Sequence, residues 1–161
     1  MGVNLVQKSD GSAALVSDRG SVDQLRVGGV ASGGNSYRGV VVVRVPLNAD
    51  DGPGGVFAWR APVGTDAIVG RVDIDVNAPA DDPCAVDIGT TDVSASTASD
   101  NLIDGVSVAA AGVFDNQTDK GANGASRRRV DAGEWVTASV ASGASAGLEG
   151  FAYIHYVPVG V

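Results

Sequence analysis

The sequence predicts an all-β protein, an antiparallel β-sandwich of the jelly-roll kind, and three observations predict it. The 23 glycines and 6 prolines divide the chain so evenly that only residues 90–104 form an interval of more than ten residues without either, which leaves no room for long helices. Between these breaks, apolar residues alternate with polar ones or form short runs, as they do in strands. Aromatic residues make up only 5% of the chain, and the apolar residues are mostly Val and Ala, which is typical of strands packed through small side chains.

The expected strands follow one another at the spacing of a sandwich. Residues 38–45 (RGVVVVRV) form an apolar run that ends at Pro46, and residues 56–60 follow the turn-forming DDGPGG and place Trp59 in the core. Residues 67–76 alternate, which predicts one face with Ile68, Val72, Ile74 and Val76 and a solvated face with Arg71, Asp73 and Asp75. The other expected strands are residues 84–88, 105–114, 134–142 and 150–157. Residues 90–104 are rich in Ser, Thr and Asp, which predicts a loop with one helical turn near residues 100–103.

The chain changes character near Asn35, which divides it into an N-terminal segment, residues 1–36, and a sandwich, residues 37–161. The N-terminal segment is polar and rich in Gly and Ser, and its apolar residues show no sustained period. It is either an arm that becomes ordered against a partner or the first strand and loops of the same domain. Its apolar residues are confined to two places: Val3, Leu5 and Val6, and then Leu25 and Val27.

Charge and composition argue against several classes of function. The net charge is −8, and residues 72–119 contain ten Asp and no Lys or Arg, so a nucleic acid would be repelled. The basic run Arg127–Arg129 is short, and we expect it in a solvated loop or in an ion pair between subunits. The sequence shows neither an apolar span for a membrane nor a signal-peptide pattern, which predicts synthesis in the cytoplasm. Cys84 is the only cysteine, which excludes an intrachain disulfide and predicts a buried small side chain.

One catalytic pattern is present: residues 143–147 (GASAG) match the G-x-S-x-G nucleophile elbow around Ser145. An elbow requires a strand before it, a helix after it, and an acid and a histidine downstream on separate elements. Here the motif lies between two expected strands, and the only histidine, His155, stands inside the second of them. The context predicts a turn and no catalytic residue, with a hydrolase as the least favoured alternative.

No cofactor is expected either, because one His and one Cys cannot build a typical zinc site. The triplet Asp73, Asp75 and Asn77 begins like a calcium loop but lacks the glycine and glutamate that such a loop needs, so a surface calcium stays an alternative to an ordinary solvated strand face. Alternation in the last strand gives one face whose residues a single small sandwich would not fully cover. We therefore expect an oligomer interface at Phe151, Tyr153, His155 and Val157.

From residue 56 onward, about two thirds of the chain resembles small virion proteins of tailed bacteriophages, of the head-decoration or head-fibre type. The phrases that carry the resemblance describe strands and turns: FAWRAPVGTDAIVGRVDIDV, DIGTT, SDNLIDGVSV and DAGEWVTASVASGASAGLEGFAYIHYVPV. The resemblance implies a non-enzymatic trimer on the capsid exterior, bound to the major capsid protein through its N-terminal segment. The attachment candidates are then Val3, Leu5, Val6, Leu25 and Val27. A receptor- or glycan-binding module of a head or tail fibre is the alternative.

Overall fold

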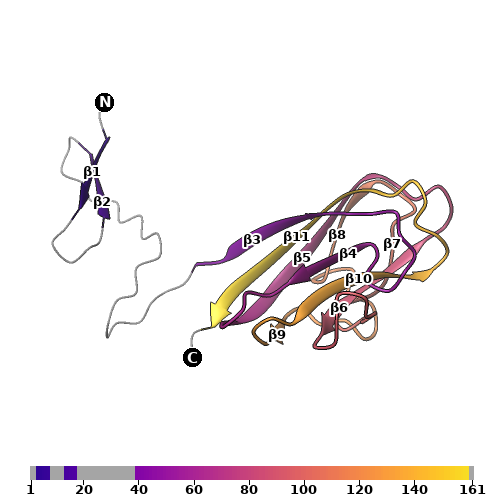
Figure 1. Cartoon of the computed structure of the whole chain (residues 1–161). Coiled ribbons are helices and arrows are strands. Elements are labelled where there is room, and N and C mark those ends of the chain that lie inside the picture. Colours follow the sequence, from indigo (N-terminus) through magenta and orange to yellow (C-terminus); the bar gives the residue numbers. More distant parts are fainter. Residues whose placement is uncertain (1–2, 8–12, 18–38, 160–161) are drawn as a thin grey trace. The chain divides into compact units, whose positions relative to one another are not determined.

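The computed structural model describes residues 3–7, 13–17 and 39–159, and all regular secondary structure in these ranges is β-strand (Figure 1). The prediction of an all-β protein is therefore confirmed. The chain divides into two compact units, residues 1–37 and residues 38–161. Among the described residues, no helix is long and apolar enough to span a membrane.

The first unit contains a two-stranded antiparallel hairpin. Strand β1 (Val3–Gln7) pairs with β2 (Ala13–Ser17), and Leu5 lies opposite Leu15. The attachment candidates Val3, Leu5 and Val6 are thus strand residues, whereas Leu25 and Val27 lie outside the described residues. The sequence interpretation missed this hairpin because two five-residue strands are too short to produce a sustained period, although Asp10-Gly11 is a known hairpin-turn signal.

The second unit is a β-sandwich of two antiparallel sheets, as predicted. The β11 sheet has the strand order β3-β11-β5-β8, with β9 also pairing with β5, and the β10 sheet has the order β4-β10-β6-β7. The strand bounds are β3 (Val41–Pro46), β4 (Phe57–Arg60), β5 (Asp66–Ala78), β6 (Ala85–Thr91), β7 (Ile103–Ser107), β8 (Gly112–Asp115), β9 (Arg128–Val130), β10 (Trp135–Ser142) and β11 (Glu149–Val159).

The strand pairs of the sandwich are nested along the chain. Leaving out the short β9, the first strand pairs with the last (β3 with β11) and the second with the second to last (β4 with β10). The third then pairs with the third to last (β5 with β8), and the two middle strands pair with each other (β6 with β7). The chain therefore passes repeatedly from one sheet to the other, and the core between the sheets is assembled from segments that are distant in sequence.

The core contains apolar side chains from both sheets. The largest fully buried ones are Phe57, Ile88, Leu102, Ile103, Leu148 and Ile154. Trp59 is partly buried against this core, where its ring lies 5.1 Å from the ring of Tyr156. Cys84 is buried, as predicted, and burial raises the pKa of its thiol.

Two expected elements differ from the structure. Residues 105–114 are not one strand, because the chain leaves β7 at Ser107 and enters β8 of the other sheet at Gly112. Residues 92–102 contain no helical turn. This loop instead covers the outer face of β10, where Thr137 is fully buried and its Oγ1 donates a hydrogen bond to the carbonyl of Thr97 (2.7 Å).

Asn116 joins two segments inside the second unit. It is fully buried, its Oδ1 accepts a hydrogen bond from the amide of Val72 (2.8 Å), and its Nδ2 donates one to the carbonyl of Ala125 (3.0 Å). We expect Asn116→Ala to lower the free energy of unfolding by about 2–4 kcal/mol, because the buried amide of Val72 and the half-buried carbonyl of Ala125 lose their partners. Chemical denaturation measures this loss. The neighbouring exposed Thr118→Ala is the control, and an equal effect of both variants would contradict the explanation.

Candidate interaction face on the β11 sheet

The outward face of the β11 sheet contains all four residues predicted for an oligomer interface. Figure 1 shows β11 between β3 and β5. The predicted alternation along β11 is confirmed: Ala152, Ile154 and Tyr156 are buried in the core, whereas the four candidates are half-buried on the other face. These four are Phe151, Tyr153, His155 and Val157.

A network of ion pairs crosses the middle of this face. Asp73 on β5 accepts a hydrogen bond from Arg71 Nε at Oδ1 (2.6 Å), and its Oδ2 lies 2.9 Å from His155 Nε2. Arg71 also pairs with Asp115 on β8 through Nη2 (2.9 Å). Burial of Asp115 would raise its pKa, but hydrogen bonds from the amides of Thr118 and Gln117 and the charge of Arg71 outweigh this and lower it. Asp73 of β5 and Asp115 of β8 are thus in contact with basic side chains of the same sheet face.

These contacts of Asp73 bear on the surface calcium site that the sequence left as an alternative. The two carboxylate oxygens of Asp73 already contact Arg71 and His155, so they do not form an open set of ligands. Within residues 3–7, 13–17 and 39–159, no group of three or more His, Cys, Asp or Glu side chains is arranged to hold a metal ion.

The two ends of the face differ. At the Phe151 end, Arg44 of β3 lies over the aromatic ring at 4.6 Å from its centre, which covers part of that ring with a cation. At the Val157 end, the surface is apolar and hollowed. Only His155 and Val157 of the four candidates line this hollow, which we call the β11 groove.

The β11 groove has a volume of about 460 Å³ and a mostly apolar floor. Its apolar residues come from β5, from β11 and from the position just before β3: Val40, Ile68, Tyr156 and Val157. Val40 is 64% exposed and Ile68 is 36% exposed, so large apolar side chains face solvent here. The polar residues of the groove are Arg71, Arg127 and His155, and none of its described lining residues is acidic.

A β-bulge creates this groove by turning Ile68 outward. His155 pairs with Arg71 and Tyr156 pairs with Val69, which leaves Gly70 as an extra residue in β5. Beyond the bulge, Ala67 and Val69 are fully buried and Ile68 lies outside. The sequence interpretation, which placed Ile68 on the core face with Val72, was therefore wrong at this position, because strict alternation takes no account of an inserted residue.

Strand β3 adds an unpaired edge to the same surface. It pairs with β11 on one side only, and no other described strand pairs with its outer side. Val42, next to the groove along β3, is 51% exposed. An exposed apolar edge strand is a surface to which another polypeptide can bind.

The G-x-S-x-G segment forms the turn between β10 and β11, as predicted. Ser145 is fully buried, and both its Oγ and its amide donate hydrogen bonds to Asp51 Oδ1, each at 2.7 Å. These two bonds lower the pKa of Asp51, and the bond from the hydroxyl has the larger effect. Ser145 therefore fastens this turn to the loop before β4, whereas His155 is engaged with Asp73 on the outer sheet face.

We expect Ser145→Ala to leave any trace of ester hydrolysis unchanged while lowering the melting temperature by about 3–8 °C. The reason is the loss of a buried hydrogen bond to a carboxylate. Calorimetry and an assay with a p-nitrophenyl ester measure the two quantities. The exposed Ser142→Ala is the control. A hydrolysis rate that falls a hundredfold with Ser145→Ala would contradict the structural role.

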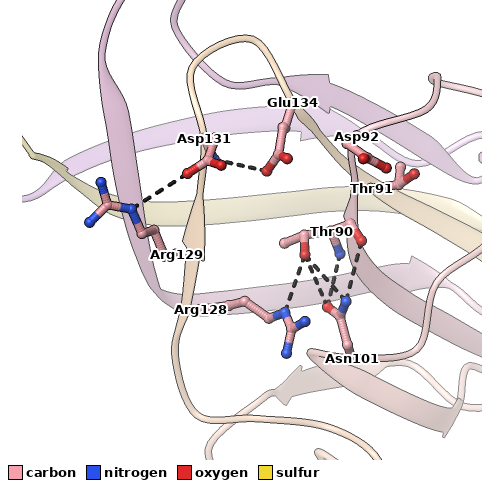
Figure 2. Close-up of a pocket in the computed structure, with 8 residues that line it drawn as sticks. All are labelled: Thr90, Thr91, Asp92, Asn101, Arg128, Arg129, Asp131 and Glu134. Carbon is pink, nitrogen blue, oxygen red and sulfur yellow. Dashed lines mark hydrogen bonds and ion pairs between the residues drawn. The ribbon is translucent and has the colours of Figure 1, made fainter.

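A second hollow, of about 380 Å³, lies between the end of β6 and the β9–β10 connection (Figure 2). Its described lining is entirely polar: Thr90, Thr91, Asp92, Asn101, Arg128, Arg129, Asp131 and Glu134. None of these residues is aromatic, so the hollow lacks the stacking surface that the glycan-binding alternative would use.

The basic run bordering this hollow is more structured than the sequence indicated. Arg128 and Arg129 belong to β9, and Arg129 pairs within the chain with Asp66 and, at 3.5 Å, with Asp131. Arg128 Nε donates to Thr90 Oγ1 (3.3 Å). Arg127 is exposed and makes no ion pair with any other described residue.

Comparison with known proteins gave no match to a family model, a curated protein or a solved structure.

Proposed function

We propose that this chain is a non-enzymatic structural protein that decorates or stabilises a bacteriophage capsid as a homotrimer. The observation that carries the proposal is the apolar cluster around the β11 groove. Of the seven exposed large apolar residues in the described part of the chain, four line the groove or lie on the adjoining β3 strand: Val40, Val41, Val42 and Ile68. Single exposed apolar residues are ordinary, but a contiguous cluster beside an open sheet edge supports a contact between proteins.

The topology supports the same proposal. A long hairpin rolled into two sheets gives the jelly roll, and its first strand pairs with its last, its second with its second to last, and so on. The nested pairs of the second unit follow this order. Jelly rolls are common in viral shells, and the fold by itself also suits lectins, so the apolar cluster is what favours assembly.

The N-terminal unit supplies the proposed attachment to the major capsid protein. It is a separate compact unit in the chain and contains a hairpin of two short strands. A two-stranded hairpin is marginally stable alone and gains from pairing with another sheet, so strand pairing with the shell is the proposed mode of binding. The proposed location of the trimer is the capsid exterior, and its proposed site of synthesis is the host cytoplasm.

Two measurements test the proposal together. Light scattering of the purified chain should give three times the mass of the chain, and the protein should sediment with capsid shells of the encoding phage stripped of it. A monomer at micromolar concentration that also fails to sediment with these shells would overturn the proposal.

A further inference from the structure

The charge of the β11 groove restricts what a second copy can place in it. The chain has a net charge of −8, yet the described lining of the groove contains two arginines and no acid. Asp73 and Asp115 neutralise Arg71, which leaves Arg127 as the cation facing a partner. In a two-fold contact of this groove with itself, neither Arg127 would meet a carboxylate from the other groove. The groove therefore favours a different, acidic surface of the second copy.

The loop after β6 offers such a surface. Val93 is 74% exposed, and Asp92 before it is also exposed. Asp92 makes no ion pair or side-chain hydrogen bond with the part of the chain that the structure describes. The other two exposed valines outside the cluster are less suited. Val113 lies on the same sheet face as the groove, and the acid nearest Val63 in sequence, Asp66, already pairs with Arg129.

The loop is fixed to the sandwich, so it presents Val93 in one conformation. Thr137 on β10 donates to the carbonyl of Thr97, and the amide of Val93 donates to Thr91 Oγ1 (3.2 Å). The backbone of Gly54 approaches Ala95 so closely that an added Cβ would stand 1.8 Å from the carbonyl oxygen. A preorganised loop loses little conformational entropy when it binds.

The loop and the groove lie at the same end of the sandwich but on different sheets. Thr91 and Arg60 both pair with Trp135, which places the loop at the end of the β10 sheet where β4 stops. Six residues after the end of β4, β5 begins at Asp66, two residues before Ile68 of the groove. Two distinct contact surfaces on each copy are what a closed ring of identical subunits requires.

We infer that the β11 groove of one copy receives the Asp92–Val93 loop of a second copy, with Val93 on the apolar floor and Asp92 beside Arg127. The inference rests on the proposed trimer and names the contact that closes it.

Charge reversal tests the inference. Arg127→Asp and Asp92→Arg should each weaken trimer formation at least tenfold, and the double variant should restore it, because the pair is reversed with its geometry kept. Analytical ultracentrifugation over a dilution series measures association. Lys120→Asp, which changes the charge equally outside the groove, should not weaken it.

A disulfide crosslink tests the same contact between copies without changing any charge. Val40→Cys combined with Val93→Cys should give covalent trimers on oxidation, whereas Val40→Cys with Val113→Cys should not. A wild-type monomer would overturn this inference, and a wild-type monomer that also fails to sediment with the stripped shells would overturn the proposed function as well. A wild-type trimer that shows neither restoration by the double reversal nor the Val40–Val93 crosslink would overturn the inference alone.

Discussion

Removal of residues 1–37 will abolish attachment to the capsid while leaving residues 38–161 folded and trimeric. The described core of the second unit runs from Leu47 to Tyr156, so the deletion removes none of its members. The same deletion removes every predicted attachment residue: Val3, Leu5, Val6, Leu25 and Val27.

The energetics of attachment explain why the loss should be complete. Ordering a free segment costs roughly 1–2 kcal/mol per residue for the backbone, and burying one apolar side chain contributes about 1.5–3 kcal/mol. Five such side chains cannot order a segment of this length by themselves. In the proposed attachment, backbone pairing of β1 or β2 with a capsid strand and the simultaneous binding of three N-terminal units supply the rest. The deletion removes the strands on which both depend.

Co-sedimentation with stripped shells measures attachment, and a thermal melt measures folding of the shortened chain. The full-length triple variant Val3→Ser, Leu5→Ser, Val6→Ser separates apolar contact from chain length and should reduce occupancy at least tenfold. Lys8→Ser is its control. Full occupancy by the shortened chain would place attachment on the sandwich, and a non-cooperative melt would place part of residues 1–37 in the fold of the second unit.

The double variant Val40→Asp, Ile68→Asp should convert the trimer to a folded monomer. Both side chains line the β11 groove and are exposed in the single chain, so the monomer loses little stability. In the trimer, the two carboxylates would be buried against apolar groups without partners, and breaking such a contact costs several kcal/mol. A loss of about 3–5 kcal/mol corresponds to a dissociation constant at least a hundredfold higher.

Ultracentrifugation measures this change, and Val113→Asp is the matched control. Val113 is 64% exposed on β8 of the same sheet face but does not line the groove. A double variant that remains trimeric at low micromolar concentration would place the subunit contact elsewhere. Equal dissociation of the Val113→Asp variant would show that added charge, and not the groove, is responsible.

Much of the sandwich could be predicted because strand formation is a local property. Glycine and proline spacing excluded long helices, and alternation in residues 150–157 separated Phe151 and Tyr153 from Ala152 and Ile154 correctly. The same alternation placed Asp73 and Asp75 on the solvated face of β5, where the structure has both half-buried and Asp73 in contact with Arg71. These assignments depend only on neighbours along one strand.

The groove could not be predicted, because it depends on pairing between distant strands. Val40, Ile68, Arg127 and Val157 come together only once β9 and β11 have paired with β5 and β3 has paired with β11. The outward position of Ile68 depends on the extra residue Gly70, whose effect appears only in the register with β11. Likewise, the split of residues 105–114 between two sheets follows from the competing partners of β7 and β8, not from their own pattern.

The sequence alone thus determined that this chain forms short strands and which face most of these strands bury. It also showed that the chain has only one histidine and one cysteine, which are too few for a typical zinc site. Only the tertiary structure decided which strands pair, where Gly70 interrupts the register, and how Ser145 and Asn116 are bonded. The physical reason is range: side-chain alternation is set by adjacent residues, whereas register, bulges and buried hydrogen bonds are set by segments far apart in the chain.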